Sequence, residues 1–439
     1  MFPRFILAAI AAAGLAIHVS RAGNPPPSKK GSPVTVTVDH ENAIYQQGET
    51  VTYTVKLIPD TSLAKDAELS WNISKDGVPP IQEGKVRLTD GTGTFTGKLD
   101  EPGHLLCRVS GIVDGKSFQA LAGAAIDPLQ IKPSLPVPDD FDQFWAEKKK
   151  QLAAVPMNPR MTPVTAISAP DVDSFDVRVD CVGKAPVSGY YVRPTNAKPK
   201  SLPIILLLHG AGVNSAKLAG ATGWCRNGFL AMDINAHGID NGQPAQYYTD
   251  LENGALRNYR YEGRNSRETS YFIGMFLRAV RAVDFLTSQP EWDGKTVVAY
   301  GGSQGGFQAF AVAALDDRIS YLSAGVPAGC DHSGMVANRI NGWPKLVPSG
   351  PDGKPDKEVL QASRYIDNVN FAARTKAKAA FVSVGFIDVT CPATTVYAAY
   401  NALPIPKEIY NDIRSGHATS STANEAKRQA MLKFVKSVQ

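Results

Sequence analysis

The hydrophobic pattern of the chain changes abruptly at a proline-rich segment, residues 128–140. Before it, apolar and polar residues alternate in short stretches separated by turn residues, which is typical of β-strands. After it, apolar strand-like runs alternate with helical patterns. Because repeated proline disfavours both helices and strand ladders, we expect an extended linker here between two domains of different classes.

The first of these domains, residues 33–127, contains seven candidate strands and no helical pattern. VTVTV at 34–38 and LLCRVSGIV at 105–113 are examples. Such a run of short strands predicts an all-β immunoglobulin-like sandwich, with Trp71 in its core. Cys107 has no second cysteine in this domain, which excludes an intradomain disulfide.

The second domain, residues 141–439, has the pattern of a mostly parallel sheet covered by helices on both faces. Its expected strands are PIILLLHG, FLAMDIN, TVVAYGG, AAFVSVG and KEIYNDI. The clearest helix is expected over 266–289, where apolar residues recur at steps of four and three and predict one buried stripe. These residues are Phe272, Phe276, Ala279, Val283 and Leu286.

Residues 1–22 have the pattern of a secretory signal peptide, cleaved after Ala22. Arg4 precedes an apolar run from Phe5 to Ile17, and Ser20 and Ala22 have the spacing that a signal peptidase reads. A membrane anchor is the alternative, but the run is shorter than the roughly 20 apolar residues that a spanning helix needs. We therefore expect a secreted or periplasmic protein without stable membrane insertion.

Charge and cysteine content exclude several classes of partner. Lys and Arg number 46 against 41 Asp and Glu, and no basic block exceeds Lys148–Lys150, so no nucleic-acid partner is expected. The cysteines form no CxxC and no Cys/His cluster of the zinc-binding kind, so we expect neither a metal nor another cofactor. Their odd number leaves at least one thiol unpaired; they are Cys107, Cys181, Cys225, Cys330 and Cys391.

Ser303 is the candidate nucleophile. It is the centre of Gly301-Gly302-Ser303-Gln304-Gly305, a GxSxG motif placed directly between an apolar strand and a helix. The glycines two positions on either side are needed because side chains there would collide with the neighbouring strand and helix. The motif by itself also fits an ordinary glycine-rich turn, and its position favours the nucleophile.

In this architecture the acid and the histidine follow the nucleophile in the order Ser, Asp or Glu, His. His417 follows the strand KEIYNDI near the end of the chain, whereas His332 precedes the strand AAFVSVG and comes too early. Asp388 follows AAFVSVG directly, although it also fits a residue that caps a turn. The other downstream candidates lie before or within strands: Asp352, Asp356, Asp367 and Asp412.

The oxyanion of an acyl-transfer reaction needs two backbone donors, one after the nucleophile and one in the loop after the third strand of the hydrolase sheet. These are the N–H groups of Gln304 and Ala211. We interpret His209 as a structural residue of this loop and His237 as structural or pocket-lining.

From about Pro138 onward, the chain resembles carbohydrate esterase family seven, the acetyl xylan esterases and cephalosporin-C deacetylases of the α/β-hydrolase fold. The matching blocks are DDFDQFWAEKKKQL, RAVDFLTSQPEWDGKTVVAYGGSQGGFQAFAVAALD and YIDNVNFAARTKAKAAFVSVGFIDVTCPATTVYAAYN. SQGG and D-x-x-CP-x-x-T-x-x-AAYN are far more specific than GxSxG. The resemblance covers about 300 residues and omits the N-terminal domain.

The resemblance implies a Ser303, Asp388 and His417 triad that deacetylates small acetylated sugars or oligosaccharides without a metal. It also implies a possible homo-oligomer, since members often form closed hexamers, which an added N-terminal domain could block. Ala211 stands where the family usually has Tyr, so a strict preference for acetyl is not implied. Ala418 replaces the usual Glu, and NAHG replaces RGQG.

These observations predict a secreted serine carboxylesterase that removes acetyl groups from xylan-type oligosaccharides. One alternative is another acyl hydrolase or an exopeptidase on the same fold, and another is a glycan-binding protein with a vestigial hydrolase domain. Tyr247, Tyr248 and Trp343 fit either a sugar-stacking wall or ordinary packing against the body.

Overall fold

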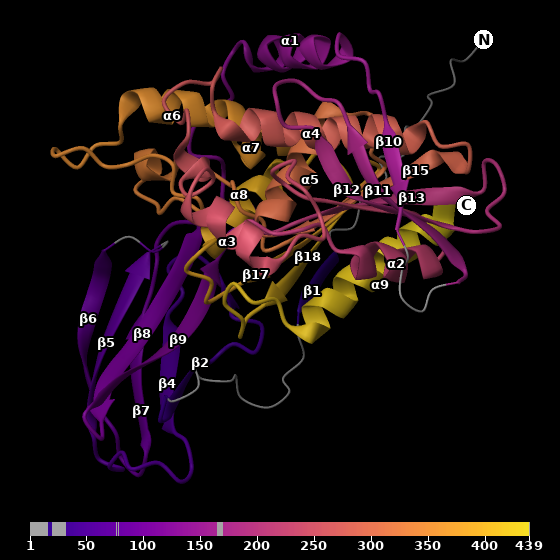
Figure 1. The fold of residues 1–439 in the computed structure, drawn as a ribbon. Coiled ribbons are helices and arrows are strands. Elements are labelled where there is room, and N and C mark those ends of the chain that lie inside the picture. Colours follow the sequence, from indigo (N-terminus) through magenta and orange to yellow (C-terminus); the bar gives the residue numbers. More distant parts are fainter. Residues whose placement is uncertain (1–15, 20–31, 76, 78, 165–169, 439) are drawn as a thin grey trace, which may run out of the picture.

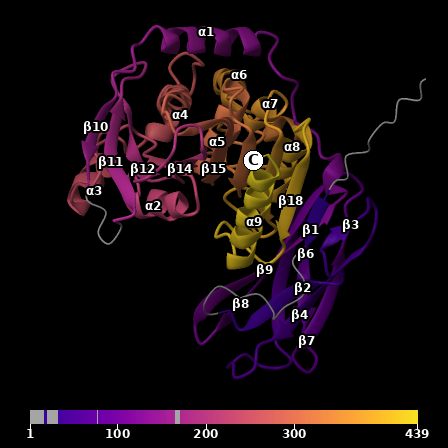
Figure 2. The same cartoon turned by 90° about the vertical axis from the view of Figure 1, so that its right-hand side faces the viewer.

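The computed structural model describes residues 16–19, 32–75, 77, 79–164 and 170–438. Two bodies are visible in Figures 1 and 2: an all-strand part from the N-terminal third, and a larger part in which helices surround a sheet. The change in architecture falls between residues 126 and 141.

The N-terminal part consists of two sheets that share one hydrophobic core. The first sheet has the order β2 (Val34–Val38), β4 (Val51–Leu57), β7 (Thr92–Gly97). The second has the order β3 (Ile44–Tyr45), β9 (Lys116–Ile126), β8 (Gly103–Val113), β5 (Glu68–Lys75), β6 (Pro80–Arg87). All seven expected strands are present, and β3 is an addition. Its assignment as an immunoglobulin-like sandwich stays a prediction.

Alternation along the strands builds this core. On β8, Leu105, Cys107 and Val109 are fully buried and belong to the core. Trp71 on β5 is also buried there and stacks on Phe95, with 4.3 Å between ring centroids. The intervening residues of β8 point to the opposite face of the sheet.

The larger part is built on a ten-stranded sheet, which confirms the expected mixed α/β class. Its order is β1 (Ala16–Val19), β18 (Lys407–Asp412), β17 (Ala379–Gly385), β16 (Tyr321–Gly325), β15 (Trp292–Gly302), β13 (Leu202–Leu208), β14 (Leu230–Ile234), β12 (Val187–Pro194), β11 (Val172–Val179), β10 (Arg160–Pro163). The strands from β1 to β14 in this order run parallel, and β12, β11 and β10 pair antiparallel.

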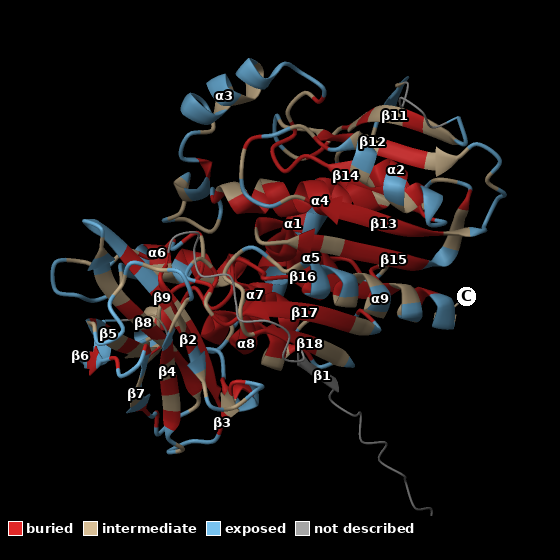
Figure 3. Cartoon of the chain, turned by 90° about the horizontal axis from the view of Figure 1, so that it is seen from below, coloured by how far each residue is buried: buried red, intermediate tan, exposed pale blue. Residues whose placement is uncertain are grey.

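Helices cover both faces of this sheet, as expected (Figure 1). On one face lie α4 (Tyr271–Thr287), α5 (Gln304–Leu315), α7 (Asn368–Ala372) and α8 (Ala393–Ala402), with α1 (Phe141–Ala153) outside them. On the other lie α2 (Leu218–Arg226) and α9 (Ser421–Val438). The remaining helices are α3 (Ala245–Asn253) and α6 (Lys357–Ser363). Figure 3 shows the central parallel strands almost wholly buried between these layers.

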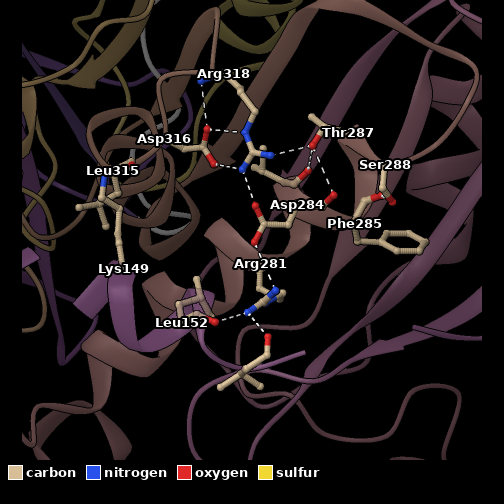
Figure 4. A network of polar contacts seen from close by, with 12 residues as sticks. Lys149, Leu152, Arg281, Asp284, Phe285, Thr287, Ser288, Leu315, Asp316 and Arg318 are labelled. Carbon is tan, nitrogen blue, oxygen red and sulfur yellow. Dashed lines mark hydrogen bonds and ion pairs between the residues drawn. The ribbon is translucent and has the colours of Figure 1, made fainter. Parts of the chain in front are cut away.

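Helix α4 carries the expected buried stripe, but it begins at Tyr271 rather than at 266 and is buried on nearly every side. Even Arg278 and Arg281 are buried. Arg281 donates hydrogen bonds to the carbonyls of Leu152, in the last turn of α1, and of Val155, just beyond this helix. Asp284 binds Arg318 (Figure 4). This network lets a helix with charged residues occupy the middle of the protein.

Most of the expected signal peptide, residues 1–22, lies outside the described residues. The exception is β1, which pairs in parallel with β18. The expected linker contains a short 3₁₀ turn at Pro128–Gln130, and Asn401 of α8 donates to the carbonyls of Pro128 and Ile131. Across the described ranges, no helix is both long and apolar enough to cross a membrane.

Candidate active site

Ser303 lies at the sharp turn between β15 and α5, with φ 54° and ψ −122°. A Cβ at Gly301 would come within 2.2 Å of the Gly305 carbonyl group, and one at Gly305 within 2.0 Å of the Leu208 carbonyl oxygen. Both distances are far below van der Waals contact, so only glycine fits at either position. Side chains at these two positions would therefore collide with neighbouring backbone, as predicted from the motif.

The structure brings the three predicted triad side chains together. The Ser303 Oγ atom is 2.8 Å from His417 Nε2, and His417 Nδ1 is 2.8 Å from Asp388 Oδ2. Ser303 follows β15, Asp388 follows β17 and His417 follows β18. Because these strands are parallel, their carboxyl ends meet at one edge of the sheet, where residues 114 and 29 positions apart can touch.

Asp388 uses its two oxygens for different contacts. Oδ1 accepts hydrogen bonds from the backbone N–H groups of Thr390 at 2.8 Å and Cys391 at 2.9 Å. Oδ2 contacts His417, whose side chain is 31% exposed while that of Asp388 is fully buried. Asp388 therefore caps a turn and orients the histidine at once, so the two readings of this residue are compatible.

Of the two predicted oxyanion donors, Gln304 follows Ser303 directly and Ala211 lies in the loop after β13. Gln304 is the first residue of α5, so its N–H has no acceptor within the helix and points along the favourable end of the helix dipole. The loop after β13 lies against Ser303, because a Cβ at Gly210 would be 3.9 Å from the Cβ of Ser303. Ala211 follows Gly210 in this loop and is exposed.

Two histidines make hydrogen bonds at the loop after β13. His209 binds Asp233 through Nε2. His237 is 3.2 Å from the Gly212 carbonyl through Nε2 and 2.8 Å from the Tyr271 hydroxyl through Nδ1. A carbonyl only accepts, so Nε2 carries the hydrogen and Nδ1 accepts from Tyr271. Burial lowers the pKa of His237 to about 4, which keeps it neutral in this structural position.

His332 takes no part in the triad. It is fully buried against the Phe307 ring, and burial lowers its pKa to about 3. Of the aromatic residues considered for sugar stacking, Tyr248 donates its hydroxyl to the Asp240 carbonyl, and Trp343 packs edge-on against Phe272. Their contacts are those of packed residues.

One group of side chains in the described ranges has the spacing of a metal site: Asp388, Cys391 and His417, with ligand atoms within 4.8 Å of one another. Asp388 and His417 already bind each other. Burial raises the pKa of the Cys391 thiol well above its usual value, which opposes the thiolate form that a metal needs. The chemistry of this group favours the triad.

Sequence reasoning left the role of the N-terminal domain open and missed its residues at the site. Strand residues of this domain, among them Arg108 and Gln119, face the loops that carry Asp388 and His417 across two cavities. The only local signal was the alternation on β8, which places a charged residue between core positions.

Comparisons with known proteins identify the family of the chain. The sequence model of the acetyl xylan esterase family (AXE1) matches residues 125–437. Acetyl esterase Axe7A of Xylanibacter ruminicola is 30% identical over 406 residues, covering 91% of this chain and 90% of that protein.

Two solved structures are similar to the larger part. The acetyl xylan esterase from Paenibacillus sp. R4 is 28% identical with a TM-score of 0.59, covering 71% of this chain and 98% of its own. Acetyl xylan esterase 1 from Thermoanaerobacterium sp. JW/SL YS485 is 22% identical with a TM-score of 0.54, covering 70% and 97%, and shows the fold alone. The match to Axe7A covers 91% of this chain and therefore extends into the N-terminal part. The matches to the two solved structures cover only 71% and 70% of this chain.

Proposed function

Since the chain belongs to the acetyl xylan esterase family and is a carboxylic ester hydrolase, we propose that it is a secreted serine esterase that removes acetyl groups from xylan-type oligosaccharides. Ser303, His417 and Asp388 form its triad. The observation that carries the proposal is the unbroken hydrogen-bond chain from Ser303 Oγ through His417 to Asp388.

In the first half of the reaction, Ser303 Oγ attacks the acetyl carbonyl carbon while His417 Nε2 takes the hydroxyl proton. The N–H groups of Gln304 and Ala211 hold the negative charge that develops on the carbonyl oxygen. One such donor contributes about 3 kcal/mol to transition-state stabilisation in other enzymes of this kind. His417 then gives its proton to the sugar oxygen, and the sugar leaves.

In the second half, water attacks the carbonyl carbon of the acetyl-Ser303 ester, and His417 Nε2 takes a proton from this water. His417 then returns the proton to Ser303 Oγ as the bond between Oγ and the acetyl carbon breaks, which leaves acetate and free Ser303. Asp388 stays ionised, holds the hydrogen on His417 Nδ1 and stabilises the imidazolium that forms in each half.

Two further parts of the proposal concern the N-terminal third of the chain. The pattern of residues 1–22 supports secretion. The two sheets around one core support an immunoglobulin-like sandwich.

The test compares the purified protein with Ser303→Ala on p-nitrophenyl acetate and on acetylated xylan. We expect acetate release from both by the wild type and a loss of about 10⁴-fold or more in kcat for the variant, with an unchanged unfolding temperature. Ser437→Ala, on the exposed last turn of α9, is the control that should keep full activity. Equal rates for Ser303→Ala and wild type would refute the nucleophile. Cleavage of peptides in place of both esters would favour the exopeptidase.

A further inference from the structure

The outer face of the five-stranded sheet packs directly on the loops that carry the triad. His104 on β8 contacts the Phe386 ring edge-on, with 5.3 Å between centroids. Next to it on β9, a Cβ at Gly123 would lie 2.2 Å from the Phe386 carbonyl oxygen. Phe386 is two residues before Asp388, so the N-terminal domain contacts the backbone that positions the catalytic acid. Figures 1 and 2 show β8 and β9 extending toward the larger part.

Two cavities remain between the domains beside this contact. The larger, of about 380 Å³, has Arg108 and Gln119 on one side and His417 and Val389 on the other. The smaller, of about 260 Å³, has Asn72 and Arg108 on one side and Asp388 and Val389 on the other. The larger has the size of a ligand pocket, and both adjoin triad residues.

Arg108 lines both cavities, and its side chain has no hydrogen-bond or ion-pair partner among the described residues. Its Nε atom is buried without a hydrogen-bond acceptor, and no ion pair of this side chain occurs in the described part of the chain. Its cross-strand neighbours, Asn72 and Leu121, are uncharged. A buried guanidinium N–H without an acceptor is costly, so the position favours a ligand that supplies one.

Basic side chains outnumber acidic ones in the cavity walls. Arg108, Arg414 and Lys345 line the two cavities, and the one acidic residue among the lining residues is Asp388, which binds His417. The planar guanidinium fork matches a carboxylate with two parallel hydrogen bonds. The chemistry therefore fits an anionic group on the carbohydrate whose acetyl ester reaches Ser303.

We propose that the space between the N-terminal domain and the loops of Asp388 and His417 is a carbohydrate subsite, in which Arg108 binds the carboxylate of a uronic acid. The uronic acid belongs to the same oligosaccharide that carries the acetyl group. Asn72 and Gln119 add uncharged groups for sugar hydroxyls. This inference rests on the proposed esterase function and narrows its substrate to acidic acetylated oligosaccharides.

The test uses an acetylated xylo-oligosaccharide that bears a uronic acid, the same compound with its carboxyl group reduced to an alcohol, and p-nitrophenyl acetate. The wild type should have a kcat/KM at least about tenfold higher on the acid than on the reduced compound, as expected for charge-assisted hydrogen bonds. Arg108→Gln should lose this preference through KM, and Arg108→Lys should keep part of it. Rates on p-nitrophenyl acetate should not change.

Arg87→Gln is the matched control, because Arg87 belongs to the same domain but is exposed on β6. Two results would overturn the proposal: a wild type that does not distinguish the two oligosaccharides, or an Arg108→Gln variant that loses activity equally on all three substrates. Calorimetric binding of the acidic oligosaccharide to Ser303→Ala and to Ser303→Ala/Arg108→Gln tests the subsite without catalysis. Weaker binding to the double variant supports the subsite even if the esterase proposal fails, and equal binding contradicts it.

Discussion

The carboxylate of Asp388 determines which ring nitrogen of His417 carries the hydrogen. Its Oδ1 accepts two backbone N–H groups, so an amide at this position must keep its oxygen there and turn its NH₂ toward His417 Nδ1. Nδ1 would then have to accept, the hydrogen would move to Nε2, and Nε2 could no longer take the proton of Ser303. The tautomer of His417 thus depends on whether residue 388 presents an oxygen or an NH₂ group to Nδ1.

We therefore predict that Asp388→Asn lowers kcat on p-nitrophenyl acetate by about 10⁴-fold with little change in KM, as the corresponding change does in serine proteases. Asp356→Asn is the control, because Asn also caps a helix and Asp356 caps α6 far along the chain from the triad. A kcat within tenfold of the wild type would show that Asp388 does not orient His417.

Lys427 is a second residue whose chemistry is set by its surroundings. It lies on α9, fully buried, and its Nζ donates to the Gly301 carbonyl at 2.8 Å beneath the nucleophile turn. Burial lowers its pKa from 10.5 to about 7. Between these two values the unfolded chain holds a proton that the folded protein has released, so stability must rise with pH in this window.

We predict that the urea midpoint of the wild type increases between pH 7 and pH 8.5 relative to that of Lys427→Met, which has no group to titrate there. Lys433→Met changes an exposed lysine on the same helix and should retain the wild-type pH dependence. Parallel curves for wild type and Lys427→Met would mean that Lys427 titrates normally in the folded protein.

At the scale of elements, the strand–turn–helix unit of β15 and α5 depends on close backbone contact between neighbouring segments. Gly305 lies in the first turn of α5, where it touches the backbone at the end of β13. Any side chain there would push α5 away from β13 and so separate the two proposed oxyanion donors, one of which belongs to each segment.

Gly305→Ala should accordingly lower kcat by at least about 100-fold, the scale of one lost oxyanion donor, and lower the urea midpoint. Gly223→Ala is its counterpart, because Gly223 lies within α2 with no atom within 4 Å of an added Cβ. That change should leave activity intact and raise the free energy of unfolding by up to about 1 kcal/mol. Similar effects of the two substitutions would contradict the contact argument.

Some strands of the large sheet can be predicted from the hydrophobic pattern of the sequence, and others cannot. The runs PIILLLHG and AAFVSVG are apolar throughout because β13 and β17 are buried on both faces, and they were identified. β16 has only five residues, YLSAG, and β11, VDSFDVRV, carries charges because it lies near the sheet edge. Neither pattern stands out without its neighbours, and both strands were missed.

At the scale of the whole molecule, the two domains meet through the contact between Gly123 and the Phe386 carbonyl. We predict that Gly123→Ala displaces the N-terminal domain, increases the radius of gyration measured by small-angle X-ray scattering, and lowers kcat/KM on acetylated oligosaccharides several-fold. Ile112→Ser, at an exposed position of the neighbouring strand β8, should change neither quantity. An unchanged radius and rate in Gly123→Ala would show that this contact does not set the arrangement of the domains.

The sequence by itself determined the nucleophile turn, the order Ser303, Asp388, His417 and the change of class at residues 128–140. These features follow from steric rules and periodicities that act over a few residues. Each segment can therefore be interpreted without knowing what it packs against. Only the tertiary structure decided that the imidazole of His417 reaches both partners and that Arg108 faces the triad loops. Those distances depend on how segments far apart in the chain pack. No local sequence pattern shows which face of a strand lies against another domain.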